Sequence, residues 1–123
     1  MSKFLAILFL FFLLVGCSTE EEKVIERLKP EEENRFSVRV FVDKTPSEEY
    51  QRSILDIFDE QSLWGEKITS HGFTIIDEES THSDDYIKIF DLKKFPGIIV
   101  FNHDGVAFRT YEVEELRVFF LNQ

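Results

Sequence analysis

The spacing of apolar residues predicts four strands. In the first, Phe36, Val38, Val40 and Val42 alternate with the polar residues Ser37 and Arg39, which indicates a strand. The run 97–101 is continuously apolar, which indicates a strand buried on both faces. The other two strands are expected at 72–77 and, after an Asn-His-Asp-Gly turn at 102–105, at 106–111.

Two helices are predicted between these strands. Thr45-Pro46-Ser47-Glu48 has the form of a helix start, in which Thr45 is the cap, Pro46 takes the first helical position and Glu48 completes a capping box. This helix is expected to reach about residue 64. A shorter helix should begin with Ser83 as its cap, because acidic residues and then apolar residues at helical spacing follow it.

A third helix is predicted over 113–121, so the elements follow the order β-α-β-α-β-β-α. The β-α-β part requires a crossover connection and therefore predicts parallel pairing, whereas the hairpin adds an antiparallel edge. We expect a single domain over 36–123, built as an α/β sandwich with a central mixed sheet.

The N-terminus has a different pattern. Residues 4–15 form an unbroken apolar run after a single cation, Lys3. A helix of that length spans about 18 Å, which is too short for a bilayer core of about 30 Å. It suits the apolar part of a cleavable export signal. Charged residues follow from Glu20, which disfavours a spanning helix.

The apolar run ends in Leu14-Val15-Gly16-Cys17, which resembles the lipobox of bacterial lipoproteins, Leu-x-Gly-Cys. The resemblance implies that residues 1–16 are a signal peptide, that diacylglycerol is attached to Cys17, and that the new amine often receives a further acyl chain such as palmitate. The lipid anchor would hold the protein in the cell membrane on its extracytoplasmic side. The alternative is an uncleaved signal anchor in which Cys17 has no role.

Residues 17–35 are dense in glutamate, and we interpret them as a lipidated cysteine followed by an acidic tether. Val24, Ile25 and Leu28 are its only apolar residues after Cys17 and would allow one or two helical turns. The formal net charge of the whole chain is −10, so we expect no nucleic-acid partner.

Cys17 is the only cysteine, and lipidation would use it. No dithiol, disulfide or thiolate nucleophile would then remain. The three histidines, His71, His82 and His103, are scattered along the chain, and we predict no metal centre and no cofactor. Segment 82–85 has two interpretations, a weak site for a hard cation or, more simply, a helix cap.

The segment 89–101, a short helix followed by the Phe95–Pro96 pair and a buried strand, resembles thioredoxin-like proteins. The resemblance covers 36–123 and implies a thioredoxin-like sandwich with a cis bond before Pro96. Redox members carry a Cys-x-x-Cys pair after the first core strand, where this chain has the segment that starts at Thr45. A hydroxyl cannot perform thiol–disulfide exchange.

These observations favour a non-catalytic binding or scaffolding module, not an enzyme. The resemblance implies that an extended peptide or envelope protein docks in a groove formed by Thr45, Pro46, Ser47, Phe95 and Pro96. The simpler alternative is that Pro96 only shapes the start of the following strand. Two other functions stay open: an accessory partner of a separate thiol–disulfide oxidoreductase, and a structural lipoprotein associated with the cell wall (peptidoglycan).

The lipobox-like ending predicts a mature chain that begins at a lipid-modified Cys17. Mass spectrometry of the membrane fraction should find that N-terminus, because the signal peptidase would cleave after Gly16. The Cys17→Ser variant should leave an unprocessed precursor or release the domain. A mature chain that starts at any other residue would contradict the prediction.

Overall fold

The computed structural model describes residues 20–76 and 85–123, so Cys17 and Ser83 lie outside the described residues. The described elements are, in chain order, α2 (Glu20–Leu28), β1 (Phe36–Val42), α3 (Glu48–Glu60), β2 (Ile68–Ile75), α4 (Tyr86–Ile89), β3 (Gly97–Asn102), β4 (Gly105–Thr110) and α5 (Val113–Leu121). The expected order of strands and helices from residue 36 onward is therefore confirmed, with α2 in addition.

The four strands form one mixed sheet in the order β2-β1-β3-β4. β1 pairs with β2 in parallel, and β3 runs antiparallel to both β1 and β4. The parallel pairing of the β-α-β part and the antiparallel hairpin are both confirmed. β1 and β3 are the central strands, and β2 and β4 are the two edges.

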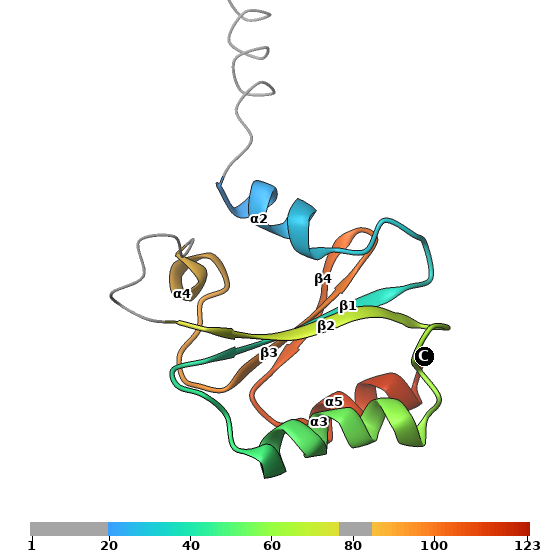
Figure 1. Cartoon of the computed structure of the whole chain (residues 1–123). Coiled ribbons are helices and arrows are strands. Elements are labelled where there is room, and N and C mark those ends of the chain that lie inside the picture. Colours follow the sequence, from blue (N-terminus) through green and yellow to red (C-terminus); the bar gives the residue numbers. More distant parts are fainter. Residues whose placement is uncertain (1–19, 77–84) are drawn as a thin grey trace, which may run out of the picture.

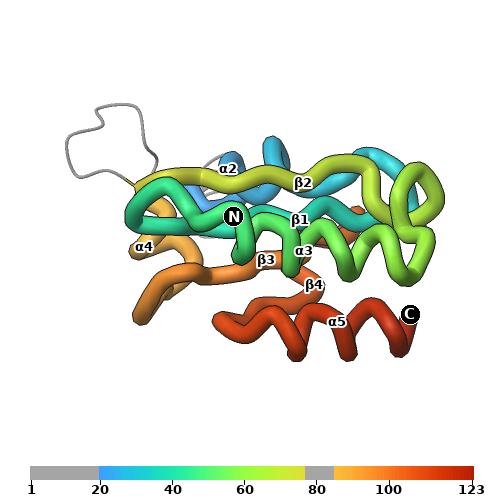
Figure 2. Tube along the Cα trace, turned by 60° about the horizontal axis from the view of Figure 1, so that its bottom comes forward, coloured from blue at the N-terminus to red at the C-terminus, as the bar shows by residue number. Residues whose placement is uncertain are grey.

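Helices cover both faces of the sheet (Figures 1 and 2). α3 and α5 lie on one face, where their apolar residues pack against alternate residues of β1 and β3. This core contains Val38, Val40, Val42, Ile54, Ile57, Phe58, Ile98, Val100, Leu116 and Phe120. The opposite face, covered by α2 and α4, has a smaller core of Val24, Phe41, Phe90, Leu92, Ile99 and Phe101.

β3 was expected to be buried on both faces, and this is confirmed. Residues Gly97 to Phe101 are all buried, with Ile98 and Ile99 belonging to the cores on opposite faces. The turn that follows is held by Asn102, whose Oδ1 accepts the N–H groups of Asp104 at 2.9 Å and Gly105 at 3.1 Å. This side-chain bond fixes the hairpin between β3 and β4.

The start of α3 differs from the expectation. Ser47, not Thr45, is the N-cap, and its Oγ accepts the N–H of Tyr50 at 3.1 Å. The chain is still extended at Ser47 (φ −64°, ψ 155°), so Pro46 precedes the helix, and its carbonyl accepts Gln51 Nε2 at 3.0 Å. Two hydroxyl residues flank the proline, and the cap is the second one.

Two other boundaries also differ. β2 begins at Ile68, four residues before the expected start, because the polar residues Ser70 and His71 pair with β1 through their backbone and need no apolar alternation. The N-cap of α4 is Asp85, whose Oδ1 accepts the N–H of Lys88 at 3.3 Å.

Residues 20–28 of the segment interpreted as a tether form α2, so the one or two helical turns that its apolar residues allow are present, and the helix packs on the sheet. Val24 is 1% exposed in the core on this face, and Ile25 and Leu28 pack beside it. The hydroxyl of Ser37 in β1 donates to the carbonyl of Leu28. The three apolar residues share one side of the helix and pack against the apolar face of the sheet.

Packing of α2 predicts a clear difference between two valines. Val24→Ala should lower the free energy of unfolding by about 2 kcal/mol, because it leaves a cavity in the core. The matched control Val118→Ala removes the same two methyl groups from a side chain that is 52% exposed, and should change stability by less than about 0.5 kcal/mol. Urea denaturation measures both. Equal effects would mean that α2 does not contribute to the fold.

Candidate functional site at one end of the sheet

The loops that hold the five predicted groove residues lie at the same end of the sheet. β1 and β3 are antiparallel, with Phe41 opposite Gly97, so the loop that follows β1 and the loop that precedes β3 leave the sheet together. The peptide bond between Phe95 and Pro96 is cis, as predicted. The topology thus places Thr45 at the same end of the sheet as Pro96.

The five residues differ in how accessible they are. Thr45 and Ser47 are exposed, and Pro46 is half-buried. The Ser47 hydroxyl is already engaged as the helix cap, which leaves Thr45 as the exposed side chain without a structural role here. Phe95 is half-buried and packs against the core under α2 and α4.

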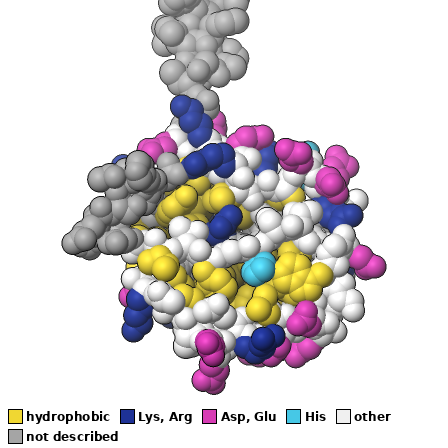
Figure 3. Space-filling model, viewed as in Figure 1, with side chains coloured by type: hydrophobic (Ala, Val, Ile, Leu, Met, Phe, Trp, Pro, Cys, Tyr) yellow, Lys and Arg dark blue, Asp and Glu magenta, His cyan; other side chains and the backbone are white. Residues whose placement is uncertain are grey.

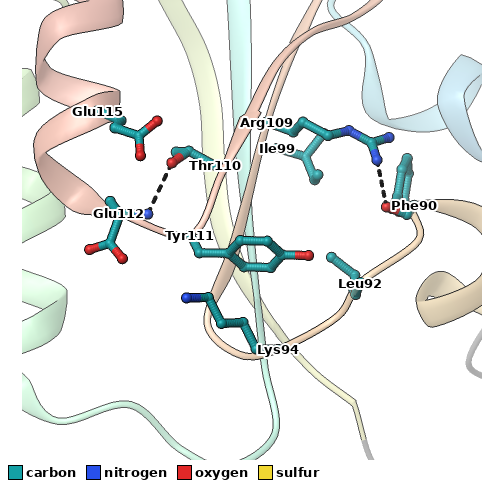
Figure 4. Close-up of a pocket in the computed structure, with 9 residues that line it drawn as sticks. All are labelled: Phe90, Leu92, Lys94, Ile99, Arg109, Thr110, Tyr111, Glu112 and Glu115. Carbon is teal, nitrogen blue, oxygen red and sulfur yellow. Dashed lines mark hydrogen bonds between the residues drawn. The ribbon is translucent and has the colours of Figure 1, made fainter.

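A pocket of about 330 Å³ lies beside this loop (Figure 4). It was not expected from the sequence. Its lining comes from the segment between α4 and β3, from β3 and β4, and from the start of α5. The lining residues are Phe90, Leu92, Lys94, Ile99, Arg109, Thr110, Tyr111, Glu112 and Glu115. Lys94 directly precedes Phe95, so the pocket adjoins the predicted groove.

Hydrogen bonds hold several of the lining residues in place. Arg109 Nη1 donates to the carbonyl of Phe90 at 2.8 Å, and the N–H of Glu112 donates to Thr110 Oγ1 at 3.0 Å, as Figure 4 shows. The ammonium of Lys94 lies 5.2 Å from the centre of the Tyr111 ring, within the range of a cation–π contact.

Tyr50 lies in the first turn of α3, and its phenol is affected by the charge of the pocket residue Glu112. Its hydroxyl is buried and has no hydrogen-bond partner among the residues that the structure describes. Burial, and to a lesser degree the negative charge of Glu112, raise the pKa of Tyr50 to about 12. The phenol therefore stays neutral at physiological pH and is an unsatisfied hydrogen-bond donor.

This end of the sheet offers charged and aromatic side chains. Lys94 and Arg109 provide positive charge, Glu112 and Glu115 negative charge, and Tyr111 an aromatic surface. Across 20–76 and 85–123, no three His, Cys, Asp or Glu side chains gather as they would around a metal ion. In the same residues no helix has the length and apolar character needed to cross a bilayer.

Sequence reasoning missed the pocket because its residues are far apart in the chain. One signal could have found part of it. β4 runs in the same direction as β1, so the residues that follow it, Tyr111 and Glu112, must lie at the same end of the sheet as Thr45. The contribution of Lys94 follows from its position next to Phe95.

No protein-family description matches this chain, and comparison with curated proteins found no significant relative. Solved structures do match. One is titled "Crystal structure of a designed protein"; it is 14% identical in sequence, and the alignment covers 82% of this chain and 89% of that one, with a TM-score of 0.51. At this level of identity the similarity concerns the fold alone, an α/β arrangement with a mixed four-stranded sheet.

The raised pKa of Tyr50 predicts a loss of stability in alkali. Below about pH 10 the phenol is protonated in both the folded and the unfolded chain, so it adds no pH dependence. Between about pH 10 and 12 only the unfolded chain releases this proton, and the free energy of unfolding should fall. Urea denaturation at several pH values should show a smaller fall for Tyr50→Phe.

The same variant should keep its stability at neutral pH, or gain up to about 1 kcal/mol, because the hydroxyl that it removes has no partner. A large loss at neutral pH would show that the Tyr50 hydroxyl is hydrogen-bonded in the folded protein.

Proposed function

We propose that this protein is an extracytoplasmic lipoprotein, anchored in the cell membrane through Cys17, whose thioredoxin-like domain binds a partner and does not catalyse redox chemistry. The observation that carries the proposal is the shared end of the sheet. There the loop of Thr45, Pro46 and Ser47 and the loop of Phe95 and Pro96 leave the sheet together.

The topology supports a thioredoxin-like sandwich. A parallel β-α-β unit is followed by an antiparallel hairpin and a final helix, in the sheet order β2-β1-β3-β4. The Phe95–Pro96 pair precedes the central strand β3, and the loop before α3 follows the central strand β1. These are the two positions that form the peptide groove in the family that the sequence resembles.

Side-chain chemistry at that groove supports binding without redox exchange. The chain has one cysteine, at position 17, so the residues around α3 offer hydroxyls in place of thiols. The Ser47 hydroxyl accepts a backbone N–H and is committed to the helix. An extended peptide could still pair with backbone groups of the loop before β3, which needs no thiol.

Docking of α2 would keep the domain close to its anchor. Only two residues separate Cys17 from Glu20, where α2 begins, and a chain of that length reaches about 10 Å. The domain would therefore lie directly at the bilayer surface, and its partner would be a membrane protein or a segment of one that reaches the surface.

The test uses the full chain in cells of its source. Cross-linking of the wild type should capture a defined envelope protein, and Thr45→Lys should abolish that capture, because the exposed Thr45 side chain borders the groove. Gln123→Lys is the matched control. It adds the same charge at an exposed position after the C-terminal end of α5, away from the groove, and should leave capture unchanged.

Three results would contradict the proposal. Unchanged capture by a folded Thr45→Lys protein would show that the groove does not bind the partner. Co-sedimentation with purified cell wall, without protein capture, would favour a structural lipoprotein. A captured oxidoreductase whose turnover depends on this protein would assign it the accessory redox role.

A further inference from the structure

Trp64 bridges Ile68 at the start of β2, and beyond that residue the outer edge of the strand is unpaired among the residues that the structure describes. The N–H of Ile76 donates to the carbonyl of Val42 in β1 at 2.7 Å. Because the backbone groups of successive strand residues alternate in direction, those of His71, Phe73 and Ile75 point away from β1. Each offers one donor and one acceptor at the open edge.

This edge lacks two of the features that protect exposed strands, charged residues and proline. The sequence of β2, ITSHGFTI, contains no charged residue and no proline, although natural edge strands commonly carry them to prevent pairing with other chains. Both edge strands have a register irregularity, β2 at Thr69 and β4 against β3, but β4 is also shorter and carries Arg109. Of the two edges, β2 is the one suited to receive another strand.

On the α3 side, apolar side chains line the open edge. His71, Phe73 and Ile75 lie opposite Val38, Val40 and Val42 and so share their face of the sheet. Ile75 is 47% exposed and Trp64 is 39% exposed, with the Trp64 and His71 rings 4.8 Å apart. Figure 3, viewed with the β2 edge at the front, shows hydrophobic side chains across the middle of this side of the molecule and most acidic ones toward its rim.

On the other side of the sheet, Arg39 extends from β1 across Gly72 of β2. A Cβ built on Gly72 would lie 2.6 Å from Arg39 Nη1, so the guanidinium occupies the space of the missing side chain. Arg39 is half-buried, and among the described residues no hydrogen-bond acceptor or carboxylate pairs with it.

The position of Arg39 determines what it can recognise. Neighbouring strands lie about 4.8 Å apart, so a side chain on a strand added next to Gly72 would be one strand spacing from the guanidinium. A carboxylate there can accept two parallel hydrogen bonds from arginine. Burial and, after it, the charge of Arg39 lower the pKa of His71.

We propose that the open edge of β2 binds an extended peptide as an added strand, with an Asp or Glu side chain of that peptide paired to Arg39 over Gly72 and its alternate apolar side chains against Trp64, Phe73 and Ile75. This surface is separate from the groove of the proposed function. The specificity comes from one carboxylate at a fixed register, and the affinity from the backbone bonds.

A second copy of this chain fits the edge less well. Antiparallel self-pairing of β2 would place a two-fold axis near Gly72, which would bring the two Arg39 guanidinium groups together. Like charges on directly neighbouring strands oppose pairing. The peptide is therefore the occupant that the charges favour.

The experiment uses the full chain, purified in detergent, and the peptide acetyl-Lys-Val-Thr-Val-Glu-Val-Thr-Val-Lys-amide. Trp64 is the only tryptophan, so its fluorescence reports binding at this edge. A second peptide with Gln in place of Glu is the comparison. The wild type should bind the Glu peptide roughly tenfold more tightly. Arg39→Gln should bind both peptides equally, and the control Arg52→Gln, at an exposed position of α3, should keep the preference.

A second pair of variants tests the backbone edge independently of Arg39. Ile75→Pro removes one outward N–H without touching the bonds to β1 and should weaken both peptides at least fivefold, while Ile75→Val, which keeps the N–H and an apolar side chain, should weaken them much less. Absence of binding by the wild type, or a Glu preference that survives in Arg39→Gln, would overturn the proposal. Dimers in sedimentation that are lost in Ile75→Pro would assign the edge to a second copy instead.

Discussion

β1 and β3 carry apolar side chains on both of their faces, and the rest of the structure follows from the need to cover each face. Helices α3 and α5 bury one face. On the other, α4 has only four residues and cannot cover Phe41, Ile99 and Phe101 alone. The N-terminal helix α2 supplies the remaining cover through Val24, because exposed aromatic surface of that size would be strongly unfavourable in water.

This constraint also determines where recognition can occur. Helices occupy both faces of the sheet, so its edges and the ends of its strands are the positions left for partners. Three strands, β1, β2 and β4, run in one direction, which brings the starts of α3 and α5 to one end. There the Thr45 loop, the Phe95 loop and the pocket around Tyr111 adjoin one another. The edge of β2 is left open because no described strand or helix covers it.

The sequence predicted those elements whose own side chains decide their structure. The strand over Phe36–Val42, the strand that starts at Gly97 and the helix Val113–Leu121 were found because their apolar spacing is regular. The start of β2 was missed, since its pairing depends on backbone contacts with β1. The helix α2 was interpreted as a tether, because its three apolar residues are too few to predict a packed helix without the sheet surface that they cover.

The candidate site was predictable in part for the same reason. The five groove residues lie in loops next to predicted strands, so a family resemblance could place them. The pocket and the position of Arg39 over Gly72 depend on the strand register and on contacts between distant segments. Neither is encoded in a local pattern, and both required the folded arrangement.

Native-state hydrogen exchange of the α2 amides tests most directly whether both faces of the sheet are covered. In the docked helix the N–H groups of residues 24–29 are hydrogen-bonded within the helix, ending with that of Lys29, which donates to Ile25 at 2.9 Å. They should be protected by many orders of magnitude, comparably to the amides of β1 and β3. Exchange of these six amides at the rate of an unstructured peptide, with β1 and β3 still protected, would contradict the account.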